Sequence, residues 1–154
     1  MVYQWKTGTM YKVEAEVAAK VMNELAAENK LSAKELVEVS RPEEAPLHNE
    51  FEWDDTAAAE KWREHQGRKM IGALVTVVEN MVQEEPITIR VFHHLEPSKP
   101  NYEPIVEIVK HEDRMEMLFK SAMKELAAFK AKYSGIQAFS KLFAVIEELE
   151  GKGA

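Results

Sequence analysis

Cysteine is absent from the 154 residues of this chain, and its absence excludes several kinds of site. Disulfide bonds, thiolate zinc sites and cysteine nucleophiles all need a thiol that the chain does not have. No apolar run approaches the roughly 18 residues of a membrane-spanning helix, and residues 1–6 lack the basic and apolar pattern of a signal peptide. We therefore expect a soluble protein in a reducing, cytoplasmic environment.

Glycine is also scarce, with only six residues in the chain. The sequence contains no P-loop, no Gly-x-Gly-x-x-Gly and no Gly-x-Ser-x-Gly, so it offers no glycine-rich loop that would hold a phosphate or present a nucleophile. We therefore expect neither enzymatic activity nor a bound cofactor.

One histidine lies among four carboxylates in residues 48–55, but the spacing of these side chains fits no metal-ligand pattern. That segment contains His48, Glu50, Glu52, Asp54 and Asp55. The two aspartates are better explained as the N-cap of the following helix. His93 and His94 follow a strand, where neighbouring side chains point to opposite faces and do not converge on one ion. We expect one of these two to be buried and hydrogen-bonded, and we expect no metal site.

Residues 1–70 have the pattern of an extended arm followed by three helices. The arm spans residues 1–9, and an amphipathic helix is predicted over residues 10–28. The apolar positions of this helix are Met10, Val13, Val17, Val21 and Leu25. A capping box formed by Ser32 and Glu35 predicts a short helix over residues 33–39. The third helix is predicted from Asp54 or Asp55 to Met70, with Ala58, Ala59, Trp62 and Gln66 on its apolar side.

The connection over residues 40–55 is predicted to be ordered, because it combines helix-breaking prolines with apolar anchors. Pro42 and Pro46 exclude a continuous helix, whereas Leu47, Phe51 and Trp53 are too apolar for a free linker. We expect Phe51 and Trp53 to be buried against the first and third helices.

Residues 71–109 predict a small antiparallel sheet. Residues 73–78 are rich in β-branched side chains, and Ile87, Ile89 and Val91 alternate with polar or aromatic neighbours. Residues 102–106 contain Pro104, which allows only an edge strand or a packed extended segment. Residues 113–150 predict two helices, the first capped by Asp113, joined by a short connection as an αα-hairpin. The expected fold is one α+β domain over residues 1–154, with helices flanking the small sheet and the hairpin at the C-terminal end.

The segment SRPEEAPLHNEFEWDD at residues 40–55 resembles a group of bacteriophage and prophage proteins with no established activity. The resemblance extends from residue 30 through Ala58–Ala59, Arg63 and the Gln66 region. It also includes a Trp-Lys-x-Gly opening at residues 5–8 and an Ala-Phe-Lys-x-Lys-Tyr motif at residues 128–133. One departure is Gly67, where the group would have alanine, a better helix former. The resemblance implies a phage origin and a location in the bacterial host cell or the virion, and it assigns no functional residue.

Two functions remain open. The first is protein–protein interaction or assembly, for which the candidate contact residues are Tyr3, Trp5, Met81 and Val82. The alternative is a helix-turn-helix-like DNA-binding protein, in which the third helix would present Lys61, Arg63, His65, Arg68 and Lys69. Residues 32–71 carry six basic and ten acidic residues within a chain of net charge −7. This balance repels phosphate and favours the first function.

Overall fold

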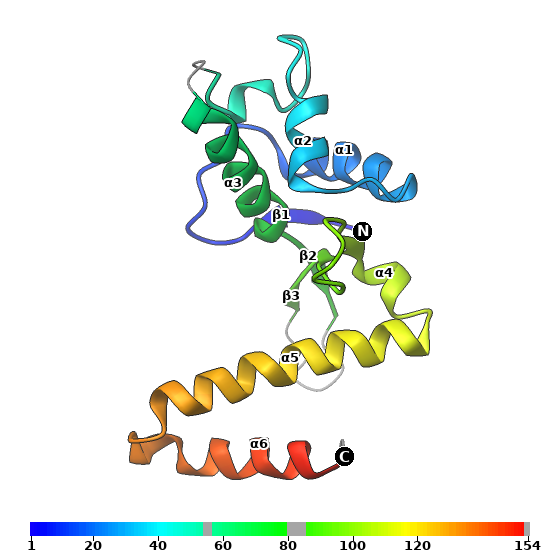
Figure 1. Ribbon diagram of the computed structural model, residues 1–154. Helices are drawn as coiled ribbons and strands as arrows, with labels where there is room; N and C mark the ends of the chain where they lie inside the picture. The colour runs from blue at the N-terminus through cyan, green and yellow to red at the C-terminus, as the bar shows by residue number, and fades with distance from the viewer. Residues whose placement is uncertain (54–56, 80–85, 153–154) are drawn as a thin grey trace. The chain divides into compact units, whose positions relative to one another are not determined.

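The computed structural model describes residues 1–53, 57–79 and 86–152 (Figure 1). Within these residues the chain forms six α-helices, a three-stranded antiparallel sheet and a two-stranded sheet, which confirms the predicted α+β class. The chain divides into two compact units, Met1–Lys110 and His111–Ala154. The second unit contains the region predicted as a helical hairpin.

The arm at the start of the chain is an edge strand of the three-stranded sheet. Strand β1 (Tyr3–Trp5) pairs antiparallel with β2 (Leu74–Val78), which pairs antiparallel with β3 (Ile87–Arg90) in the order β1-β2-β3. Tyr3 and Trp5 are half-buried against the core of this unit. The predicted extended conformation is confirmed, and strand pairing supplies the hydrogen bonds that a free arm would lack.

A second, two-stranded sheet joins β4 (Phe92–His93) to β5 (Glu103–Pro104). The predicted extended segment over residues 102–106 is therefore correct only to Pro104, because Ile105 and Val106 belong to helix α4 (Ile105–Ile108). This single turn of helix directs Ile108 into the core, where its side chain is fully buried. The gain from burying an isoleucine favours the turn over a longer strand.

Helix α1 (Ala15–Ala27) begins five residues later than predicted and buries a different face. The sequence predicts Met10 and Val17 on the buried face. Both are exposed, Met10 to 97 % and Val17 to 37 %. The buried residues are Ala15, Ala18, Ala19, Met22 and Leu25. The late start has a tertiary cause, because the carboxylate of Glu50 accepts the backbone N–H groups of Lys12 and Val13 at 3.0 and 2.9 Å. The backbone N–H groups of residues 12 and 13 therefore have a hydrogen-bond acceptor without belonging to the helix.

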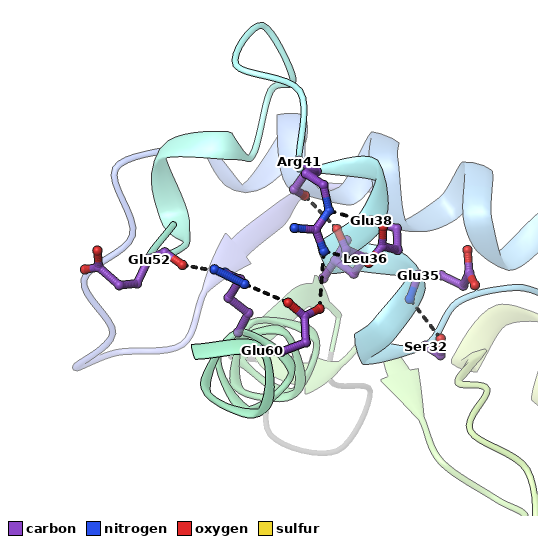
Figure 2. Close-up of polar contacts among 9 residues, drawn as sticks. Ser32, Glu35, Leu36, Glu38, Arg41, Glu52 and Glu60 are labelled. Atoms are coloured by element: carbon purple, nitrogen blue, oxygen red, sulfur yellow. Dashed lines mark hydrogen bonds and ion pairs between the residues drawn. The ribbon is translucent and has the colours of Figure 1, made fainter. Parts of the chain in front are cut away.

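Helix α2 (Ala33–Val39) has the predicted bounds, and Ser32 is its N-cap, with Oγ accepting the backbone N–H of Glu35 at 3.2 Å (Figure 2). The structure shows this half of the predicted capping box. Helix α3 (Ala57–Ala73) packs closely against it at Gly67. A Cβ atom at Gly67 would lie 3.1 Å from the carbonyl oxygen of Ala33. The glycine that weakens α3 as a helix therefore permits the contact between α2 and α3.

The connection before α3 is ordered and packed, as the sequence predicts. It contains a 3₁₀ turn (His48–Glu50), and Leu47 and Phe51 are buried in the core. Trp53 is only half-buried, contrary to the prediction, and its indole N–H donates to the carbonyl oxygen of His48 at 2.8 Å. The predicted caps Asp54 and Asp55 lie outside the described residues.

The second unit is an antiparallel helical hairpin, as predicted. Helix α5 (Glu112–Tyr133) is followed by a 3₁₀ turn (Gln137–Phe139) and helix α6 (Ser140–Lys152). The predicted cap at Asp113 is wrong, because His111 occupies the N-cap position and Asp113 lies in the first turn. Four aromatic rings pack where the helices meet, with neighbouring centroids 4.8 to 6.4 Å apart: Phe129, Tyr133, Phe139 and Phe143.

Candidate functional surfaces

The histidines of the candidate metal segments serve structural contacts. Nδ1 of His48 lies 3.1 Å from the carbonyl oxygens of Ser40 and Arg41, so this nitrogen donates, and the ring stacks on Trp53 at 4.9 Å. His93 is half-buried and His94 is exposed, contrary to the prediction that one of them is buried. Among the residues that the structure describes, no group of three His, Asp or Glu side chains is placed to hold a metal ion.

Arg63 is a core residue, which corrects its assignment to a nucleic-acid surface. Its side chain is enclosed, with the residue only 2 % exposed. Nε donates to the carbonyl oxygen of Glu52 at 2.6 Å, and Nη1 donates to the carboxylate of Glu60 at 2.6 Å. The guanidinium also lies 5.1 Å from the ring centroid of Trp53. Arg63 therefore attaches the connection before α3 to that helix, and its side chain is too enclosed to contact a phosphate.

A second arginine extends this network to α2. Figure 2 shows Arg41 between Glu38 and Glu60, with N–O distances of 2.8 and 3.3 Å. The hydrogen bond from Arg63 holds the pKa of Glu60 below its usual value, and the bond from Arg41 does the same for the pKa of Glu38. Both carboxylates are therefore ionised partners of the arginines. Because Arg41 binds Glu38 of α2 and Glu60 of α3, the network connects the two helices.

The remaining basic residues predicted on α3 lie at its surface. Lys61, Arg68 and Lys69 are exposed, and His65 is half-buried. Trp62, predicted on the apolar side, is 51 % exposed and lies against His65 with ring centroids 5.4 Å apart. The prediction is wrong for Trp62 because the buried side of α3 follows Ala59, Arg63, Gly67 and Met70.

The exposed side of α3 borders a concave surface of about 630 Å³, here called the basic groove. Its charged side chains are Lys6, Arg68, Lys69 and Arg90, and it also contains His65 and Tyr11. No aspartate or glutamate is among its lining residues. Lys6 and Arg90 were not among the candidates, because only the pairing of β1 and β3 with β2 brings them beside α3.

A second groove of about 330 Å³ continues from the first and shares Thr9, Tyr11, His65 and Lys69 with it. It adds the exposed Trp62 and the carboxylate of Glu50. This carboxylate already accepts the two backbone N–H groups of residues 12 and 13. We call this surface the aromatic groove.

The hairpin presents a different kind of surface, because it is apolar. A groove of about 490 Å³ between α5 and α6 is lined by Phe119, Met123, Ala127 and Leu149, with two lysines and two glutamates beside them. Met115, Phe119 and Val145 are 40 to 52 % exposed. Among the described residues of this unit, only Ile146 is fully buried.

The aromatic residues predicted to contact a partner at the start of the chain have contacts within the fold. The indole N–H of Trp5 donates to the carbonyl oxygen of Val13 at 2.8 Å, and the hydroxyl of Tyr3 accepts from Asn23 at 3.1 Å. Met81 and Val82, the other two predicted contact residues, lie outside the described residues.

No family model, curated protein or solved structure matches the chain. None of the helices in the described part of the chain is long and apolar enough to cross a membrane.

Proposed function

We propose that this chain is a non-enzymatic protein of bacteriophage or prophage origin that acts by protein–protein association, and that its C-terminal hairpin associates with a second copy. The observation that carries the proposal is the incomplete burial of the hairpin, in which only Ile146 is fully buried among the described residues. Two helices cannot enclose an apolar core between them, and helices gain most of their stability from packing an apolar face. An additional surface is therefore needed to cover this one.

The pattern of α5 supports a helical partner. Its apolar positions alternate at spacings of four and three residues, the spacing of a coiled-coil seam: Met115, Phe119, Ala122, Leu126, Phe129 and Tyr133. Phe129 and Tyr133 pack against the aromatic rings that precede and begin α6. Met115, Phe119 and Ala122 remain exposed, because α6 has 13 residues and α5 has 22. The uncovered part of the seam is thus the part nearest the start of α5.

The charge distribution supports a second copy as the partner. Residues 111–154 carry seven acidic and seven basic residues, so the net charge of −7 belongs to residues 1–110. Two hairpins therefore meet without net repulsion. The first turn of α5 contains Glu112 and Asp113, and its last turn contains Lys130 and Lys132. Antiparallel pairing of two α5 helices places each acidic end beside a basic end, in the self-complementary manner of a twofold interface and a four-helix bundle.

The mass in solution tests this proposal. We expect the parent protein to sediment or scatter light at twice its chain mass of 17.6 kDa at concentrations of tens of micromolar. Phe119→Glu should shift it to the monomer, because a charge replaces a ring at the centre of the exposed seam. Ala131→Glu adds the same charge at an exposed position on the opposite side of α5 and should leave the dimer intact. A parent that stays monomeric at 100 micromolar, or equal effects of the two substitutions, would overturn the proposal.

The helix-turn-helix alternative has less support. Arg63, one of its five candidate contact residues, is buried, and residues 40–56 separate α2 from α3 where such motifs have a turn of three or four residues. Two of the exposed cations of α3, Arg68 and Lys69, nevertheless line the basic groove.

A further inference from the structure

The basic groove is assembled by three elements in a defined register. The backbone N–H of Lys6 donates to the carbonyl oxygen of Ala73 at 2.9 Å, and Arg90 pairs with Val75 on β2. Residues 73 and 75 are two apart, so Lys6 and Arg90 flank the same face of the sheet. Ala73 is also the last residue of α3, which places Lys69 one helical turn away. Nη2 of Arg90 lies 3.9 Å from the Cβ position of Gly72 on that last turn.

Three of the four cations of the basic groove are not neutralised by an ion pair within the described residues. Among the described residues, Lys6, Lys69 and Arg90 make no ion pair, and Arg68 makes one, to Glu64 at 3.5 Å. Residues 1–110 contain seven more acidic than basic residues, so a groove with four cations and no carboxylate is opposite in charge to the unit that carries it. A concave surface of one sign concentrates ions of the opposite sign. The basic groove thus favours an anion.

The size of the surface favours an extended anion over a single one. The basic groove measures about 630 Å³ and continues, through four shared residues, into the aromatic groove of about 330 Å³. Volumes of this size accommodate molecules much larger than a phosphate ion. A chain of linked phosphates would place one negative charge near each of several cations.

The aromatic groove indicates what accompanies the phosphates. Trp62 is half exposed beside His65, and Tyr11 lines both grooves. Proteins that bind single strands combine a basic groove for the backbone with aromatic side chains on which bases stack. A duplex keeps its base faces stacked inside the helix, so it would leave Trp62 without a partner. The same surface would recognise the backbone of DNA or RNA.

We propose that the basic and aromatic grooves of residues 1–110 form a binding site for single-stranded nucleic acid, with Lys6, Lys69 and Arg90 on its phosphates and Trp62 stacked on a base. This site lies in the other unit from the hairpin and does not depend on self-association. It also differs from a helix that enters a duplex groove, because two of the four cations of the basic groove lie outside α3: Lys6 follows β1, and Arg90 belongs to β3.

Binding of a fluorescein-labelled 12-nucleotide oligo(dT), followed by anisotropy at 50 mM salt, tests the phosphate contacts. Lys6→Glu/Lys69→Glu should weaken binding at least about tenfold and lower the slope of log K against log salt by about 1.4, since each phosphate contact to a single strand contributes about 0.7. Lys20→Glu/Lys141→Glu makes the same change in net charge at exposed positions outside the groove and should alter the affinity less than about twofold. Equal losses in the two variants would show attraction by overall charge and would overturn the site.

Trp62→Ala tests the stacking contact independently of charge. It should weaken oligo(dT) binding about fivefold or more, because stacking on one base contributes a factor of at least this size, whereas Trp62→Phe should retain most of the affinity. A 12-base-pair duplex should bind more weakly than the single strand. The proposal is overturned if the parent protein leaves the anisotropy unchanged at 100 micromolar, or if it prefers the duplex and Trp62→Ala has no effect.

Discussion

Replacing Arg63 by alanine should destabilise residues 1–110 far more than the same change at Lys61, although both are basic residues near the start of α3. Arg63 is enclosed and donates to the carbonyl oxygen of Glu52 and to the carboxylate of Glu60. Lys61 is exposed and makes no ion pair among the described residues. The comparison therefore isolates the buried position from the loss of a positive charge.

The magnitude follows from the contacts that the substitution removes. A hydrogen bond from a charged donor to the carbonyl oxygen of Glu52 contributes about 1.5–3 kcal/mol, and the guanidinium against Trp53 contributes about 0.5–1 kcal/mol. The side chain of Glu60 is 44 % exposed, so water screens its ion pair and hydrates the carboxylate left behind. The substitution also removes a charge whose burial costs desolvation free energy, and this gain offsets part of the loss. We expect a net destabilisation of about 2–3 kcal/mol for Arg63→Ala and less than about 0.5 kcal/mol for Lys61→Ala.

Urea denaturation followed by tryptophan fluorescence measures this difference. All three tryptophans, Trp5, Trp53 and Trp62, belong to residues 1–110, so the signal reports on that unit without a contribution from the hairpin. With an m-value of about 1–3 kcal/mol per molar, the expected loss lowers the midpoint by about 0.7–3 M for Arg63→Ala. Midpoints that differ by less than about 0.2 M between the two variants would refute the enclosed position of Arg63, because that difference is too small for the loss of a buried contact.

Two further predictions concern the contact between α2 and α3. Gly67→Ala should lower the melting temperature despite the helix propensity that alanine adds, with a cost of about 1 kcal/mol or more, because the new Cβ lies 3.1 Å from the carbonyl oxygen of Ala33. Gly151→Ala in α6, where nothing lies within 4 Å of the new Cβ, should not lower it, and a rise in both variants would contradict the close approach of α2 and α3. Unit 1–110 should also lose stability as the pH falls below the usual carboxylate pKa of 4.5 and through the lowered pKa of Glu60 in the folded protein, because the unfolded chain then binds the proton more tightly. Glu60→Gln should flatten the denaturation midpoints measured between pH 7 and pH 3, and an unchanged pH profile would count against the bond from Arg63.

Much of the fold could be predicted from the sequence, where the cause of a structure is local. Ser32 specifies the start of α2 because an N-cap side chain accepts a backbone N–H only three residues further along the chain. Alternation in β3 and the long apolar stripe of α5 specify a strand and a helix because their periods are intrinsic to the backbone geometry. Pro42 and Pro46 exclude a helix in the connection because proline lacks the N–H that a helix needs.

The surfaces depended on tertiary structure, because they join residues that are far apart in the chain. Glu50 delays the start of α1 by accepting the N–H groups of residues 12 and 13, more than 35 residues away. Arg63 and Lys61 are both basic residues near the start of α3, and the sequence alone does not distinguish them. Only the packing of α3 against the connection makes Arg63 a core residue. Lys6 and Arg90 line the same groove as Lys69 because strand pairing places them beside α3. Sequence thus determined where helices and strands form, whereas tertiary packing decided which face each one buries, because burial depends on partners that local periodicity does not identify.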